Sequence, residues 1–164
     1  MKKLLFISIA ALLASGCASQ SVTPFPTEEL PNNVCVVKHK EVKEGVVNAI
    51  QDGFKKNGVE TRVITGSYDV SGGKFLQPYT APTWKQPLID VAEAAGCETM
   101  VYYTAHWGWD IVPYMRWANI WAQDGDEKQI AQAGYFSGNG FGKFSKARGT
   151  ILDMIDKMFG TYTK

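Results

Sequence analysis

The apolar positions of the chain follow two periods, which together predict an α/β fold. Val34 to Val37 is a β-branched run between Asn-Asn and charged residues, as is typical of a buried strand. Between residues 42 and 54 the apolar positions repeat at helical spacing, and Asn57-Gly58 supplies a C-terminal cap. Val59 to Thr65 has the composition of a second strand. The pattern predicts a β-α-β unit with parallel strands.

The second half of the chain predicts two further helices and three further strands. The helices are expected over residues 88–95, closed by Gly96, and around residues 147–158; the strands are expected over Glu98 to Trp109, Ile111 to Gln123 and Gln129 to Phe136. Asp124-Gly125 is a turn signal, so the three strands are expected to form an antiparallel meander. Pro113 favours an edge position or a bulge for its strand. The order β-α-β-α-β-β-β-α predicts a single mixed sheet with helices mainly on one face, in one domain over residues 34–164.

The first residues have the layout of a bacterial export signal. Lys2 and Lys3 precede an apolar run of eleven residues, which suits a signal peptide and is short for a bilayer span. The segment Leu13-Ala14-Ser15-Gly16-Cys17 then resembles the lipobox of bacterial lipoproteins. The resemblance implies removal of residues 1–16 and acylation of Cys17, with palmitate-type chains as the membrane anchor. An ordinary signal peptide and a buried N-terminal helix are the alternatives.

The residues after the lipobox bear on location and charge. Ala18, in place of an Asp, implies export of such a lipoprotein to the outer membrane, on its periplasmic leaflet; exposure at the cell surface is the alternative. Residues 17–33 contain three prolines and small polar residues without a period, and they predict a flexible tether. Removing the signal takes away two lysines and no acid, which changes the net charge from +1 to −1. That charge argues against nucleic-acid binding.

The cysteines divide into one anchor and one pair. If Cys17 is acylated, Cys35 and Cys97 remain as an even pair in an oxidising compartment. Each lies at the start of a predicted strand, and the first and third strands of a β-α-β-α-β unit are commonly neighbours. The pair is therefore a candidate disulfide, and two separate buried thiols are the alternative.

The sequence offers no catalytic or metal-binding signature. His39, His106 and Asp110 have ligand chemistry, but they lack the close spacing of zinc sites. There is no G-x-S-x-G motif, and the glycines of residues 138–142 lack the further features of a nucleotide loop. We therefore expect no catalytic residue, no metal and no cofactor.

An aromatic block is the most informative part of the domain. Its candidate interface residues are Trp107, Trp109, Tyr114, Trp117 and Trp121. Strand alternation places Met115 on one face with Trp117 and Trp121, while Ala118 and Ala122 would let a helix approach the other face. Exposed aromatic residues of that density mark an interface or a ligand groove. The alternative is that the irregular segment 66–87 covers them.

A second resemblance rests on this block. Tyr103 to Asp110, read as Tyr-Thr-Ala-His-Trp-Gly-Trp-Asp, is similar to a Tyr-Thr-Ala-x-Trp-x-Trp-Asp pattern of small Gram-negative envelope lipoproteins that have no assigned activity. The favoured hypothesis is a non-enzymatic binding or envelope-assembly module, anchored in the membrane by acyl chains and contacting an envelope protein. The alternative is a small-ligand-binding or hydrolytic protein with a site under the 66–87 loop, near His106 and Asp110.

Overall fold

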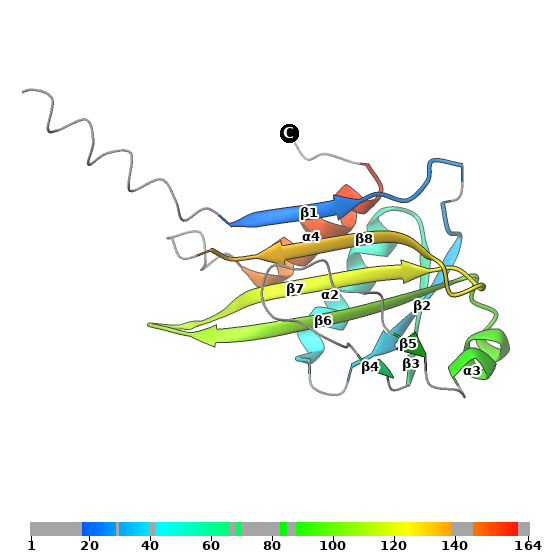
Figure 1. Cartoon of the computed structure of the whole chain (residues 1–164), viewed down its shortest axis with the longest axis horizontal. Coiled ribbons are helices and arrows are strands. Elements are labelled where there is room, and N and C mark those ends of the chain that lie inside the picture. Colours follow the sequence, from blue (N-terminus) through cyan, green and yellow to red (C-terminus); the bar gives the residue numbers. More distant parts are fainter. Residues whose placement is uncertain are drawn as a thin grey trace, which may run out of the picture.

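The protein is seen here in a computed structural model, which describes residues 18–28, 30–39, 42–65, 68–69, 83–84, 88–138 and 146–160. The strands are β1 (Ser19–Thr23), β2 (Asn33–Lys38), β3 (Glu60–Thr65), β4 (Tyr68–Asp69), β5 (Thr83–Trp84), β6 (Thr99–Trp109), β7 (Pro113–Gln123) and β8 (Gln129–Phe136). The helices are α2 (Glu44–Lys56), α3 (Leu88–Ala95) and α4 (Ala147–Met158) (Figure 1). None of these helices is long and apolar enough to cross a bilayer.

One six-stranded sheet forms the centre of the fold, in the order β1-β8-β7-β6-β2-β3. The pairs β2–β3 and β2–β6 are parallel, whereas β6, β7, β8 and β1 pair in antiparallel fashion. The predicted mixed sheet is confirmed, including the β-α-β unit and the neighbouring positions of β2 and β6. β4 and β5 form a separate two-stranded sheet.

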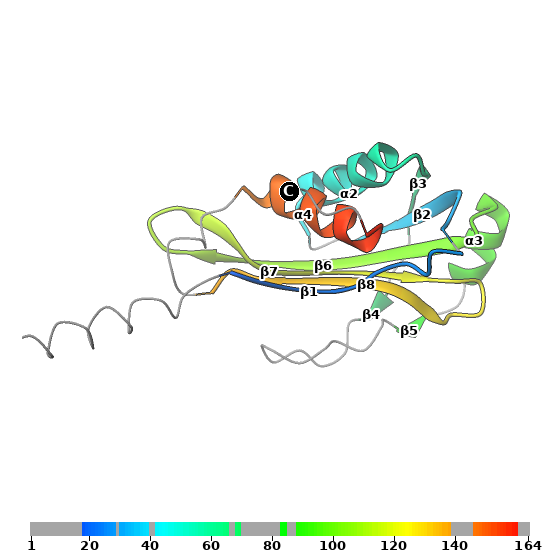
Figure 2. The ribbon, with the colours of Figure 1, turned by 90° about the horizontal axis from the view of Figure 1, so that it is seen from above.

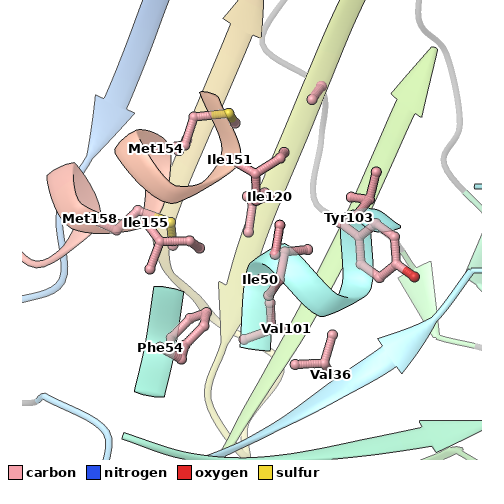
Figure 3. Close-up of a cluster of buried hydrophobic side chains, with 14 of the residues drawn as sticks. Val36, Ile50, Phe54, Val101, Tyr103, Ile120, Ile151, Met154, Ile155 and Met158 are labelled. Atoms are coloured by element: carbon pink, nitrogen blue, oxygen red, sulfur yellow. The ribbon is translucent and has the colours of Figure 1, made fainter. Parts of the chain in front are cut away.

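Helices α2 and α4 pack side by side over one face of the sheet, as predicted (Figure 2). Their apolar sides meet the inward residues of the central strands in the main core (Figure 3). Labelled members of that core are Val36, Ile50, Phe54, Val101, Tyr103, Ile120, Ile151, Met154, Ile155 and Met158. The two helices approach closely because Gly53 of α2 lies directly against Ile155 of α4. A buried carboxylate also joins them: Asp156 accepts from Lys56 Nζ at 2.5 Å and from Asn57 Nδ2 at 3.1 Å.

The opposite face of the sheet has its own, smaller core. β4 and β5 lie on that side, and α3 lies at one end of the sheet (Figure 2). The cluster contains Cys35, Val37, Ile64, Ala92, Met100, Tyr102 and Trp121. Both faces of the sheet are therefore covered near the β2–β6 junction.

The N-terminal part of the predicted tether is a strand, which corrects the predicted domain boundary at residue 34. Residues 19–23 form β1, an edge strand that pairs with β8 along its whole length. Val22 packs against the main core, and Gln20 exchanges hydrogen bonds with Asp153 and Lys157 of α4 at 2.8 and 2.7 Å. These partners lie more than 100 residues later in the chain. The composition of residues 17–33 carries no sign of them, and on that composition the segment was predicted to be a flexible tether.

Pro113 does not mark an edge strand, because β7 lies in the interior of the sheet. It is the first residue of β7, and pairing with β8 begins only at Trp117. No residue of β8 pairs with Pro113, so the missing N–H of the proline breaks no hydrogen bond to β8. The other predicted option, a bulge, does occur in β7, three residues further along the strand.

Candidate interaction surface

Strands β6 and β7 form a hairpin whose distal half extends past the helices (Figures 1 and 2). We call residues 106–117 the distal hairpin. Four of the five aromatic residues predicted as an interface, Trp107, Trp109, Tyr114 and Trp117, lie in it. The structure thus brings most of the aromatic block together at one end of the sheet.

Trp121 is the exception, and its assignment to an interface was wrong. The side chain is fully buried in the smaller core, with Tyr102 and Cys35 in the same cluster. In the sheet Trp121 lies directly opposite Tyr102, on the face where β4 and β5 lie. The described side chains in the cluster around Trp121 come from β2, β3, β6 and the α3 segment, and most of residues 66–87, the segment named in the covered-face alternative, lie outside the described part.

A β-bulge reverses the facing of the residues near the tip. Opposite β6, His106 pairs with Trp117 and Trp107 pairs with Met115, which leaves Arg116 as the extra residue. Strand alternation predicted Met115 on the same face as Trp117. Because of the bulge, Met115 instead points to the other face and is buried in the helix-facing core. Pro113 was the signal for a bulge in the sequence, but the position of the bulge depends on the strand pairing.

Two aromatic residues of the distal hairpin are held by neighbouring cations or rings. The Lys43 ammonium group lies 4.1 Å from the ring centroid of half-buried Trp107, a cation–π geometry that sequence reasoning missed. On the other face, the exposed His106 ring stacks on half-buried Trp117, with centroids 5.6 Å apart and planes 17° apart. Tyr114 lies over Gly108, where an added Cβ would come within 2.8 Å of its ring.

The tip of the hairpin is apolar and exposed. Trp109 is 76% exposed, Ile111 82% and Val112 48%. Asp110 and Arg116 are the only residues with a formal charge between residues 99 and 123. Exposed apolar groups of this kind are common where proteins contact other surfaces.

The residues proposed for a ligand or hydrolytic site are not gathered into one. His106 lies within β6, and Asp110 lies four residues later in the turn, about 13 Å along an extended chain. His39 follows β2, where its main-chain N–H donates to the Tyr103 hydroxyl at 3.1 Å. Burial raises the pKa of that hydroxyl above 10.0, and Glu44 adds to the rise against the effect of the hydrogen bond. Within the described ranges no three His, Cys, Asp or Glu residues group as metal ligands.

A solvent-filled depression of about 810 Å³ lies elsewhere, between α2 and the edge strand β3. Most of its lining residues have polar side chains, among them Gln51, Lys55 and Arg62. Neither His106 nor Asp110 contributes to it, so it gives no support to the predicted ligand site.

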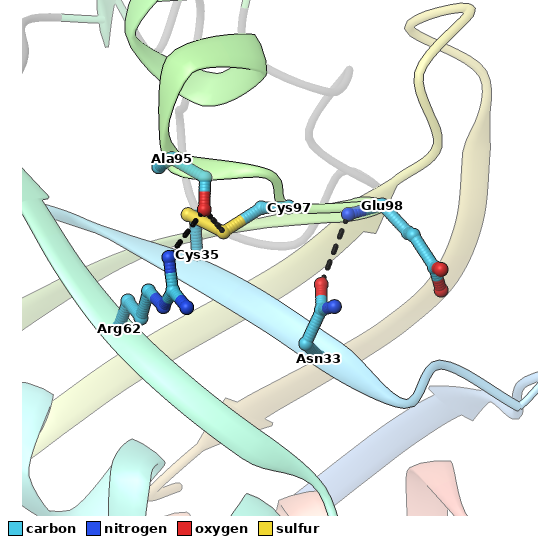
Figure 4. Close-up of a disulfide and its surroundings, with 6 residues drawn as sticks. All are labelled: Asn33, Cys35, Arg62, Ala95, Cys97 and Glu98. Carbon is cyan, nitrogen blue, oxygen red and sulfur yellow. Dashed lines mark hydrogen bonds between the residues drawn. A yellow bond between two sulfur atoms is a disulfide. The ribbon is translucent and has the colours of Figure 1, made fainter.

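The cysteine pair lies on the smaller core. Cys35 of β2 and Cys97, between α3 and β6, form a disulfide across 62 residues of chain (Figure 4). Arg62 donates to the Ala95 carbonyl at 2.6 Å beside it. These bonds attach α3 to the sheet, far from the distal hairpin. Cys17 lies outside the described residues.

Comparisons with known proteins show the fold of the chain but no family. No family model and no curated protein matches it. The solved structure of the PelC dodecamer from Paraburkholderia phytofirmans is similar, with a TM-score of 0.57, 11% identity, and coverage of 88% of this chain and 96% of that one. A second structure, of a single-substitution variant of that dodecamer, gives a TM-score of 0.56 at 11% identity, with the same coverage. TolB from Acinetobacter baumannii matches at a TM-score of 0.46 and 12% identity, over 88% of this chain and 31% of the other.

Proposed function

We propose that the protein is a lipid-anchored, non-enzymatic binding or assembly module of the Gram-negative envelope. Acyl chains on Cys17 hold it at the periplasmic leaflet of the outer membrane, and the distal hairpin is its contact surface. The lipobox-like segment ending at Cys17 supports the anchor. The similar fold of PelC, whose structure is described as a dodecamer, supports looking for an assembly role.

The exposed aromatic surface of the distal hairpin is the observation that carries this proposal. The strands β6 and β7 continue beyond the helices that would otherwise cover them. His106 and Trp117 form a stacked pair on one face of that extension, and Trp109 is largely exposed at its end. Such a surface gains by burial against a partner, and aromatic residues are the usual anchors of interfaces.

Photo-crosslinking in intact cells tests the contact surface. A photo-reactive residue replaces His106, and a matched control replaces Glu60, an exposed residue of the edge strand β3. We expect a defined adduct from position 106 that the control position lacks and that disappears in Cys17→Ser cells. Equal adducts from both positions, or none from position 106, would contradict the contact surface.

Mass spectrometry of the mature N-terminal peptide tests the anchor separately. Wild-type protein should carry the mass of acyl chains on Cys17 and should partition with outer-membrane fractions. Cys17→Ser protein should lack both properties. An unmodified Cys17 in the mature wild-type protein would overturn the anchor and, with it, the proposed location.

A further inference from the structure

We propose that the tip of the distal hairpin is a second membrane contact, inserting Trp109, Ile111 and Val112 into the leaflet that holds the acyl chains of Cys17. This inference rests on the proposed lipid anchor and names the partner of the tip, a phospholipid surface. It follows from where the first strand begins, how far the hairpin extends and which residues it exposes.

The start of β1 places the anchor at the hairpin end of the sheet. Ser19 pairs with Phe136, Phe136 with Trp117, and Trp117 with His106, so these four residues form one row across the sheet. Cys17 precedes Ser19 by two residues, which span at most about 7 Å of chain. Only this short length of chain therefore separates Cys17 from the row.

The hairpin extends at least as far as the anchor in the same direction. Trp109 lies three residues beyond His106 on β6, which corresponds to about 10 Å of strand, and the turn residues continue further. Figures 1 and 2 show the hairpin tip projecting past the beginning of β1, at the end of the sheet opposite α3. The tip thus reaches the depth at which the acyl chains of Cys17 enter the leaflet.

The strand that carries the anchor is tied to the domain, so the sheet has a defined position relative to the membrane. β1 pairs with β8 at five positions. Gln20 donates to Asp153 of α4 at 2.8 Å and accepts from Lys157 at 2.7 Å. A long flexible tether would let the hairpin tip point in any direction relative to the membrane. Only two residues separate the anchor from the paired strand β1, and this short connection restricts the direction of the tip.

The composition of the tip suits the boundary between headgroups and acyl chains. Trp is amphipathic and favours that boundary, and Ile111 and Val112 add apolar side chains beside it. Lys43, against Trp107, and Arg116, in the bulge, lie just behind the tip, where anionic headgroups would attract them. Asp110, in the exposed turn, remains at headgroup level.

Quenching by brominated lipids tests the insertion. Full-length lipidated protein is reconstituted into phosphatidylethanolamine–phosphatidylglycerol vesicles, with and without bromine on the acyl chains, and tryptophan emission is recorded. We expect quenching of the wild-type protein and loss of most of it in Trp109→Phe. Trp117→Phe, a matched change in the same hairpin, should retain it. Ile111→Asp, an exposed substitution, should reduce quenching while far-UV circular dichroism stays unchanged.

The outcomes separate the tip from the anchor. Protein that floats with vesicles and carries acyl chains, but whose Trp109→Phe variant is quenched as strongly as wild type, overturns the membrane contact and leaves the anchor in place. Wild-type protein that carries no acyl chains and does not float with vesicles overturns both the anchor and the membrane contact of the tip. A photo-reactive residue at position 111 that captures a protein rather than phospholipid in cells also overturns the membrane contact.

Discussion

The contact between α2 and α4 makes a sharp prediction for one glycine. A Cβ added to Gly53 would lie 2.9 Å from Cβ of Ile155 and 3.0 Å from both Cγ atoms. Those atoms sit at the base of a fully buried side chain, so they can move only if the helices separate. Gly53→Ala gains about 1 kcal/mol of helix propensity but loses about 1–3 kcal/mol to overpacking. Because three atoms are involved, we expect the overpacking cost to lie in the upper half of that range, which leaves a net loss of about 1–2 kcal/mol of unfolding free energy.

Gly45→Ala is the matched control in the same helix. An added Cβ at Gly45 meets nothing within 4 Å, so the substitution changes propensity without changing packing. It should leave the unfolding free energy unchanged or raise it by up to about 1 kcal/mol. The same substitution in the same helix is therefore expected to lower the unfolding free energy at Gly53 but not at Gly45.

Urea unfolding followed by tryptophan fluorescence measures both variants, and a double-mutant cycle identifies the cause. Ile155→Ala removes both Cγ atoms and should cost about 2–5 kcal/mol alone. In the Gly53→Ala background the cost should be smaller by at least about 0.5 kcal/mol, because the new methyl group occupies part of the vacated space. A Gly53→Ala protein as stable as wild type, or strictly additive variants, would refute the packing argument.

Three further predictions concern the disulfide, one buried tyrosine and the hairpin. Replacing Cys35 and Cys97 by Ala should cost about 4 kcal/mol for a bridge across 62 residues, and an unchanged urea midpoint would contradict this. Because the pKa of Tyr103 is raised in the folded state, its contribution to stability is present below pH 10.0 and lost as the pH rises through the raised value. Urea titrations on both sides of that pH should show a steeper fall for wild type than for Tyr103→Phe. Gly108→Ala should displace the Tyr114 ring and cost about 1 kcal/mol by thermal unfolding, and the cost should vanish in a Tyr114→Ala background.

The periodic segments of the chain could be predicted from sequence because their signals are local. The apolar repeat of residues 42–54 and the Asn57-Gly58 cap correspond to α2, where Gly58 has φ +79°. Asp124 likewise begins a turn, in which its carboxylate accepts from the N–H groups of Asp126 and Lys128. In each case a residue and its neighbours a few positions away determine the conformation.

The candidate surface could be predicted only in part, because a period of two shows which residues share a face and not what covers that face. Trp117 and Trp121 share one face of β7, yet the first is half-buried on the distal hairpin and the second is fully buried in the smaller core. The bulge at Arg116 then transfers Met115 to the other face. No local signal distinguishes these outcomes, since they depend on which strands end where.

By itself, the sequence determined the order of the elements from β2 onward, apart from the short strands β4 and β5, as well as the mixed character of the sheet and the concentration of aromatic residues in one hairpin. Only the tertiary structure decided that residues 19–23 are a strand and that its first residue pairs with the last residue of β8. An edge strand of polar composition is stable only through partners far along the chain, here β8 and α4. Such pairing is a property of the assembled sheet, which local composition does not encode.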